Sequence, residues 1–131
     1  MIMKYYYEVK VKDSFKDAKE KVIDALSKEG FGILSEINVK ETFRKKLDVD
    51  FDDYIILGAC NPGFAYRAFH ADNKIGTMLP CNVIVRNDGK GITEVAAIDP
   101  YETMKVIDNE DLNEIAKEIR VKLKNALDSI S

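Results

Sequence analysis

ILGACNPGFAYRAF, residues 56–69, decides the fold because it contains the change from a buried strand to a helix. Residues 54–59 are apolar on both faces, which is typical of a central strand of a sheet. Asn61 is suited to cap a helix and Pro62 to begin one, so the pattern predicts a helix that ends at about Ala71.

A second Cys-Asn pair lies further along the chain in LPCNV, residues 79–83, where another apolar run begins. Residues 81–87 and 92–98 are predicted to be strands joined by a hairpin at Asp88-Gly89. Asp99-Pro100 then repeats the combination of a capping residue and a proline. This pattern predicts a short helix that runs to about Val106.

The other segments follow from the same criteria of periodicity and capping. They are a strand over residues 4–12, a helix from Asp13 or Ser14 to about Lys28, a strand over 31–39, a short helix over 39–47 and a last helix that starts at Asn109 or Asp111. The order β-α-β-α-β-α-β-β-α-α indicates a single α+β domain over residues 1–131. If helices 39–47 and 62–71 are insertions, the plain scheme is β-α-β4-α with an antiparallel sheet.

The composition excludes several classes of function. The chain has 131 residues with 20 basic and 23 acidic side chains, and its net charge of −3 argues against general nucleic-acid binding. No apolar run approaches the roughly 20 residues that cross a bilayer, and the N-terminus lacks the apolar core of a signal peptide. The expected protein is cytoplasmic, without a membrane partner, and its two cysteines are expected to be reduced thiols.

Four motifs together resemble a widespread prokaryotic family, domain of unknown function 302. They are EGFGILSEINV (29–39), ILGACNP (56–62), LPCNV (79–83) and AIDP (97–100). The resemblance implies a compact α+β domain with an antiparallel sheet, of the type of the TATA-binding protein, and often a homodimer. It implies no activity and no catalytic residue.

The directions of the strands predict where the motifs meet. If strands two to five pair antiparallel in sequence order, then Cys60, Cys81 and Asp99 lie at the same edge of the sheet. Two helices start at this edge, and their unpaired N–H groups favour an anion or a carboxylate. The hypothesis is a ligand-binding rim whose candidate residues are Cys60, Asn61, Gly63, Cys81, Asn82 and Asp99.

Three interpretations of this rim remain open. The first is a module that binds a small anionic ligand or a partner, with backbone N–H groups of residues 62–64 as donors. The second is a thiol-dependent enzyme or carrier that uses Cys60 or Cys81. The third is purely structural, because caps, turns and buried thiols explain each residue separately. Whether the protein is an enzyme is left undecided.

Metal and cofactor sites are not expected. Two thiols and the single histidine, His70, are too few for a zinc site, and no nucleotide fingerprint is present. Phe64, Tyr66 and Phe69 are predicted to lie in the core. Because two central strands are apolar on both faces, helices 39–47 and 62–71 or a second subunit are expected to cover the outer face of the sheet.

Overall fold

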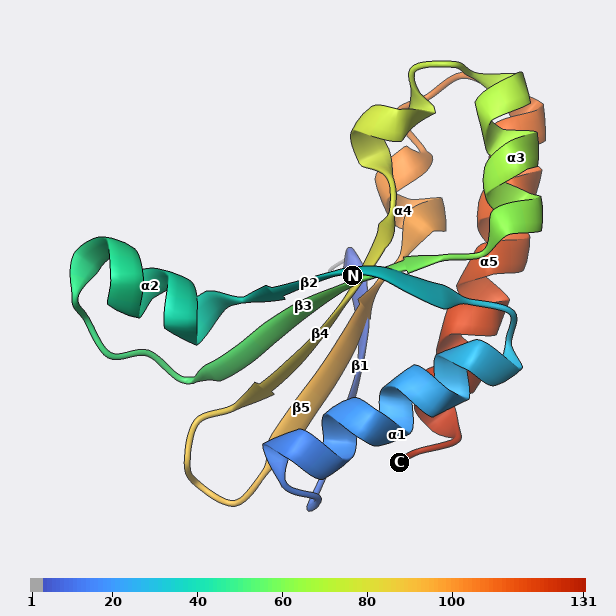
Figure 1. The fold of residues 1–131 in the computed structure, drawn as a ribbon. Coiled ribbons are helices and arrows are strands. Elements are labelled where there is room, and N and C mark those ends of the chain that lie inside the picture. Colours follow the sequence, from blue (N-terminus) through green and yellow to red (C-terminus); the bar gives the residue numbers. More distant parts are fainter. Residues whose placement is uncertain (1–3) are drawn as a thin grey trace.

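Five antiparallel strands form one sheet in a computed structural model, which describes residues 4–131 (Figure 1). The order across the sheet is β1-β5-β4-β3-β2. The strands are β1 (Tyr6–Val11), β2 (Gly32–Asn38), β3 (Asp53–Cys60), β4 (Cys81–Asn87) and β5 (Thr93–Ile98). The prediction of an α+β fold with an antiparallel sheet is confirmed, and β1 closes the order by pairing with β5.

Two long helices cover one face of this sheet, and four shorter helical segments lie around its ends (Figure 1). The long helices are α1 (Phe15–Lys28) and α5 (Glu110–Asp128); the shorter ones are α2 (Val39–Leu47), α3 (Pro62–Ala71), the 3₁₀ turn η1 (Ile75–Met78) and α4 (Pro100–Met104). Side-chain caps fix where α1 and α5 begin. The Ser14 side chain accepts from the Asp17 amide, and that of Asn109 accepts from the Leu112 amide.

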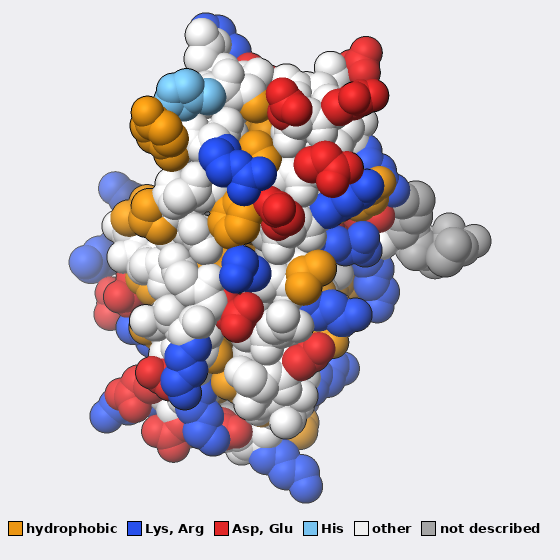
Figure 2. All heavy atoms as spheres, turned by 90° about the vertical axis from the view of Figure 1, so that its right-hand side faces the viewer, with side chains coloured by type: hydrophobic (Ala, Val, Ile, Leu, Met, Phe, Trp, Pro, Cys, Tyr) orange, Lys and Arg blue, Asp and Glu red, His pale blue; other side chains and the backbone are white. Residues whose placement is uncertain are grey.

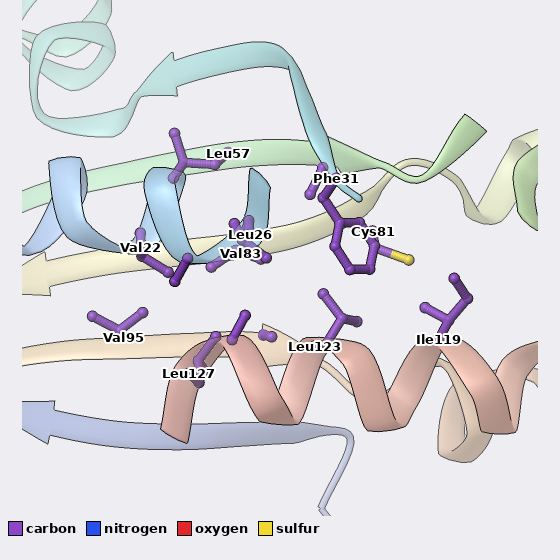
Figure 3. Packing of buried hydrophobic residues seen from close by; sticks show 14 of the residues in the cluster. Val22, Leu26, Phe31, Leu57, Cys81, Val83, Val95, Ile119, Leu123 and Leu127 are labelled. Carbon is purple, nitrogen blue, oxygen red and sulfur yellow. The ribbon is translucent and has the colours of Figure 1, made fainter. Parts of the chain in front are cut away.

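The core lies between the inner face of the sheet and the helices α1 and α5 (Figure 3). Leu57 of β3, Leu26 of α1 and Leu127 of α5 are fully buried there. Burial of one such side chain stabilises the fold by roughly 1.5–3 kcal/mol. Cys81 lies at the end of this core, beside Phe31. The packed layer therefore stops where the two Cys-Asn motifs begin.

The strand register brings the two cysteines to the same edge of the sheet. Ala59 pairs with Cys81, and Gly32 pairs with Cys60, so the two thiols lie on neighbouring strands. Asp99 directly follows the end of β5 and is at this edge as well. The prediction that these motifs converge is confirmed.

The prediction that helices 39–47 and 62–71 cover the outer face of the sheet is wrong. α3 continues past the end of β3 and packs against α5, on the side of the core (Figure 1). α2 contacts β3 and β2 at their other end and has no buried residue. Both helices start where a strand ends, so each continues beyond the sheet. Within residues 4–131 the outer face is left open.

Candidate functional site

An apolar pocket of about 240 Å³ lies at the edge of the sheet where the cysteines meet. Its walls come from the ends of β3 and β4, from α3, from α4 and from α5. Almost all of the lining side chains are apolar, and only Asn61 contributes a side-chain amide. The pocket is where the packed core ends, so it extends the apolar interior toward solvent.

The two thiols differ in their surroundings. Cys81 is 7% exposed, and burial raises the pKa of its thiol to about 12, with a smaller contribution from the neighbouring Cys60. Cys60 is half-buried at the same pocket. A thiol with this raised pKa stays protonated at neutral pH. Cys81 is therefore an uncharged part of the pocket wall and a poor nucleophile.

Asn61 occupies the cap position of α3, but its side chain makes no capping hydrogen bond. Its Nδ2 group instead donates to the carbonyl oxygen of Glu29 at 3.2 Å, at the end of α1. Gly30 has a φ of +89°, and a Cβ there would lie 2.9 Å from Asn61 Nδ2. The motifs EGFG and ACNP are therefore two halves of a single contact that ties α1 to the start of α3.

The first turn of α3 consequently keeps free N–H groups beside the pocket. The amide of Ala65 donates to the Asn61 carbonyl at 2.9 Å, and Pro62 has no N–H. The amides of Gly63 and Phe64 precede the first intrahelical hydrogen bond and receive no side-chain cap. Phe64 lines the pocket, whereas Gly63 is exposed in front of it.

Asn82 lies on the other face of the sheet. It pairs with Gly58 across β3 and β4, and it is exposed on the open face, whereas Cys81 is buried on the inner face. Successive residues of a strand point to opposite faces, so the second Cys-Asn pair is divided between the two faces. The structure does not bring Asn82 together with Asn61.

Asp99 lies at the same edge but faces a different cleft. Its Oδ1 accepts from the amides of Tyr101 and Glu102 at 3.1 and 3.3 Å, and its Oδ2 pairs with Arg120 Nε at 3.0 Å. The prediction that Asp99 caps the following helix is confirmed. Because the carboxylate is occupied by α4 and Arg120, its charge is not directed at the apolar pocket.

Sequence reasoning missed the helical walls of the pocket. Ala65 and Ala68 of α3 face Ala116 of α5 across it, and these small side chains leave the space unfilled. Alanines at helical spacing in both segments are the available signal. The placement of the aromatic residues in the core was wrong for Tyr66, which is 69% exposed, and for Phe69, which is 45% exposed at the pocket.

Residues 4–131 offer neither a metal site nor a membrane-spanning helix. No group of three or more His, Cys, Asp or Glu side chains in this range is placed to hold a metal ion. None of the helices described for these residues combines the length and the apolar character that a bilayer crossing requires.

Comparison with known proteins gives the family. A family model described as "Domain of unknown function DUF302" matches residues 7–130. The chain belongs to this family. A crystal structure of an uncharacterized conserved DUF302 protein from Bacillus stearothermophilus is 30% identical, with a TM-score of 0.89, and the likeness covers 97% of this chain and 98% of that one. No curated protein matches. The resemblance to DUF302 is confirmed, and the family carries no assigned function.

Proposed function

We propose that this DUF302 protein binds a small molecule that has an apolar body and one anionic group. The observation that carries the proposal is the apolar pocket of about 240 Å³ that opens beside the uncapped first turn of α3. Ligand sites are concave, mostly apolar and supplied with a few polar groups that fix orientation, and this pocket has that composition.

The volume limits the ligand to a monocyclic or short-chain molecule. An apolar cavity of about 150 Å³ in a protein binds benzene. The 240 Å³ here exceeds that by roughly the volume of a short substituent. Phenylacetate and similar aryl carboxylates have a matching body, and burial of their rings supplies the main binding free energy.

The start of α3 is the position that we propose for the anionic group. A helix N-terminus carries a partial positive charge, and the amides of Gly63 and Phe64 are free to donate. Asp99 is the acidic candidate of the rim, and its carboxylate is paired with Arg120 and with the amides of α4. This occupation reduces the repulsion that the carboxylate would otherwise exert on a bound anion.

A thiol-dependent function remains the alternative, and it now rests on Cys60. Cys81 is unsuited because burial raises its pKa to about 12. Cys60 ends β3, two residues before α3 begins at Pro62, and it is half-buried at the pocket. We retain the expectation of a cytoplasmic protein in which both thiols are reduced. Cys60→Ser distinguishes the functions because it preserves a binding module and abolishes thiol chemistry.

The test is a thermal-shift titration with phenylacetate, with benzyl alcohol as the uncharged comparison. A ligand that binds only the native state raises Tm with concentration, and phenylacetate is expected to do so more strongly than benzyl alcohol. Ala65→Leu fills the pocket and is expected to abolish both shifts. Tyr66→Leu places the same side chain on the exposed side of α3 and serves as the control.

Two results would contradict the proposal. One is an equal response of wild type and Ala65→Leu, which would place any binding elsewhere. The other is the absence of a shift for a set of aryl and alkyl carboxylates and their neutral analogues up to millimolar concentrations, which would leave the pocket a packing defect between α3 and α5.

For the open face of the sheet, we propose a second copy of this chain as the partner. Tyr54, Ile84 and Ile98 lie on this face, and Arg86 between them is neutralised by Glu94 at 2.8 Å and by Asp52. A partner that covers this face therefore does not need a carboxylate to pair with Arg86 at its centre. At the rim, the basic helix α2 pairs with the acidic segment 48–53 within the chain, through Lys40 with Asp53 and Arg44 with Asp50. Light scattering is expected to give the mass of two 14.8-kDa chains.

A further inference from the structure

A second cleft, separate from the apolar pocket, runs between β1, the junction of β5 with α4, and α5. Its volume is about 690 Å³. Four basic side chains line it, against two carboxylates, and they are Lys4, Lys105, Arg120 and Lys124. The whole chain has a net charge of −3, so this local excess of positive charge contrasts with the rest of the molecule. Figure 2 shows basic side chains gathered along one side of the face it presents.

The spacing along α5 brings its basic groups to the same side of the helix. Lys117, Arg120 and Lys124 are separated by three and four residues, which places them on successive turns of one face. Lys105 joins them from the end of α4. The ring of Tyr101 lies under three of these cations, at 5.1 Å from Lys105, 5.6 Å from Lys117 and 5.4 Å from Arg120.

Arg120 pairs with a carboxylate that is largely buried. The Asp99 side chain is 10% exposed, caps α4 through Oδ1 and contacts Arg120 Nε through Oδ2 at 3.0 Å. The Arg120 side chain is 45% exposed, and its Nη groups make no hydrogen bond within residues 4–131. These are the two donors at the outer edge of the guanidinium, which suit bidentate contact with an oxyanion.

The acidic groups around the cleft leave part of the positive charge unmatched. Glu102 pairs with Lys105 at 3.1 Å, and Glu114 pairs with Lys117 at 3.3 Å. Asp128 accepts the hydrogen bond of the Tyr7 hydroxyl. Lys124 lies 5.2 Å from the centroid of the Tyr7 ring and has no carboxylate partner among residues 4–131. Lys124 is therefore available to an anion.

We propose that this cleft binds the phosphate group of a small phosphate monoester. Arg120 supplies a pair of Nη donors to two phosphate oxygens, and Lys124, which has no carboxylate partner among residues 4–131, supplies further positive charge. Tyr7 forms a side wall against which the ester's organic part packs. Arginine and lysine together are the side chains that proteins use for phosphate, since guanidinium matches its geometry and ammonium adds a point charge.

The test is isothermal titration calorimetry with glycerol 3-phosphate and with inorganic phosphate at low salt. Wild type is expected to bind both, and Lys124→Gln is expected to weaken binding by about tenfold, the loss of one charge-assisted contact. Arg120→Lys keeps the charge and loses the paired Nη donors, so it is expected to weaken binding as well. Lys90→Gln, in the hairpin between β4 and β5, makes the same change of net charge away from the cleft and is expected to leave binding unaltered.

Several outcomes would overturn this proposal. They are no saturable binding of either phosphate, an equal loss in Lys90→Gln, and binding of long polyanions such as heparin without binding of the monoester. The result is separable from the carboxylate pocket, because Ala65→Leu is expected to retain phosphate binding and Lys124→Gln is expected to retain the phenylacetate shift.

Discussion

At the scale of single residues, the contact between Asn61 and Gly30 explains two motifs at once. Gly30 ends α1 with a positive φ, and its missing Cβ makes room for the Asn61 amide that bonds to Glu29. A capping role for the Asn61 side chain, the natural expectation from an Asn-Pro sequence, is replaced by this tertiary hydrogen bond. Asn61 thus stabilises the fold, while its orientation leaves the first turn of α3 open.

The contact predicts coupled effects on stability. Asn61→Ala is expected to lower the free energy of unfolding by about 1 kcal/mol through the lost hydrogen bond. Gly30→Ala is expected to cost about 1 kcal/mol for its positive φ and more for the clash with Asn61. In the double variant the clash is absent, so urea unfolding should give a coupling energy of at least about 0.5 kcal/mol.

Gly89 provides the control for this double-mutant cycle of Asn61→Ala and Gly30→Ala. It has a φ of +84° and no atom within 4 Å of a Cβ built on it, so Gly89→Ala introduces the backbone strain without the clash. Gly89→Ala should be additive with Asn61→Ala. Additivity of Gly30→Ala with Asn61→Ala would show that the two residues do not meet as described.

The buried thiol of Cys81 predicts a pH dependence of stability. Its pKa is raised from 9.0 to about 12 in the folded protein, so between these values the unfolded chain releases a proton that the folded chain retains. Stability from this group is therefore complete below pH 9 and falls as the pH rises above it, by at most about 1.4 kcal/mol per pH unit.

The measurement is urea unfolding from pH 8 to pH 10.5 for wild type, Cys81→Ala and Cys60→Ala. Tyrosines and lysines titrate in the same range, so the difference between proteins is the readout. Wild type and Cys60→Ala should lose stability more steeply than Cys81→Ala. Parallel curves for wild type and Cys81→Ala would contradict the pKa assigned to this thiol.

At the scale of elements, β2, β3 and the segment before β4 meet closely at Gly58. A Cβ on Gly58 would lie 2.3 Å from Ser35 Oγ and 2.8 Å from Pro80 Cγ. Gly58 therefore lets the Ser35 side chain and the Pro80 ring lie over the outer face of β3. The Pro80 ring packs against Gly58 in this way, and Leu79, Pro80 and Cys81 all line the apolar pocket.

Gly58→Ala is expected to lower the free energy of unfolding by about 1–3 kcal/mol, because the added methyl group overpacks this crossing. Ser35→Gly should restore only part of the loss, since the Pro80 ring remains in place. Gly32→Ala, in β2 with nothing within 4 Å of its Cβ, is the matched control and should change stability by less than about 0.5 kcal/mol. Equal effects at Gly58 and Gly32 in urea unfolding would contradict this account.

At the scale of the whole molecule, the sheet is covered on one face only. α1 and α5 cover the inner face, and no helix of residues 4–131 lies over the outer face (Figure 1). A large uncovered apolar face is uncommon on a monomer. The second copy that we propose would bury this face and leave the apolar pocket and the basic cleft, which lie elsewhere, accessible.

Ile84→Lys is expected to convert the proposed dimer into a folded monomer. Ile84 is half-buried on the outer face opposite Ile56 and Ala96, so a lysine there would be desolvated only in the dimer. Val106→Lys makes the same kind of change at a site that is 86% exposed, and it should leave the mass unaltered. The masses of both variants by light scattering test this, and a wild-type protein that is monomeric would exclude the second copy.

The sequence by itself determined the local structure and the meeting point of the motifs. Apolar runs on both faces marked β3 and β4, alternation marked β1, and the pairing of successive strands brought Cys60 and Cys81 to one edge. These features follow from periodicity and strand direction, which act over short stretches of chain.

Only the tertiary structure decided what the motif residues do. The Asn61 amide turns to Glu29, a residue 32 positions away, and Asn82 lies on the face opposite Cys81. The pocket depends on alanines of α3 and α5 that meet only when the helices pack. Likewise Arg120 pairs with Asp99 from the end of β5. Contacts between segments far apart in the chain leave no periodic signal, because packing geometry rather than local propensity selects them.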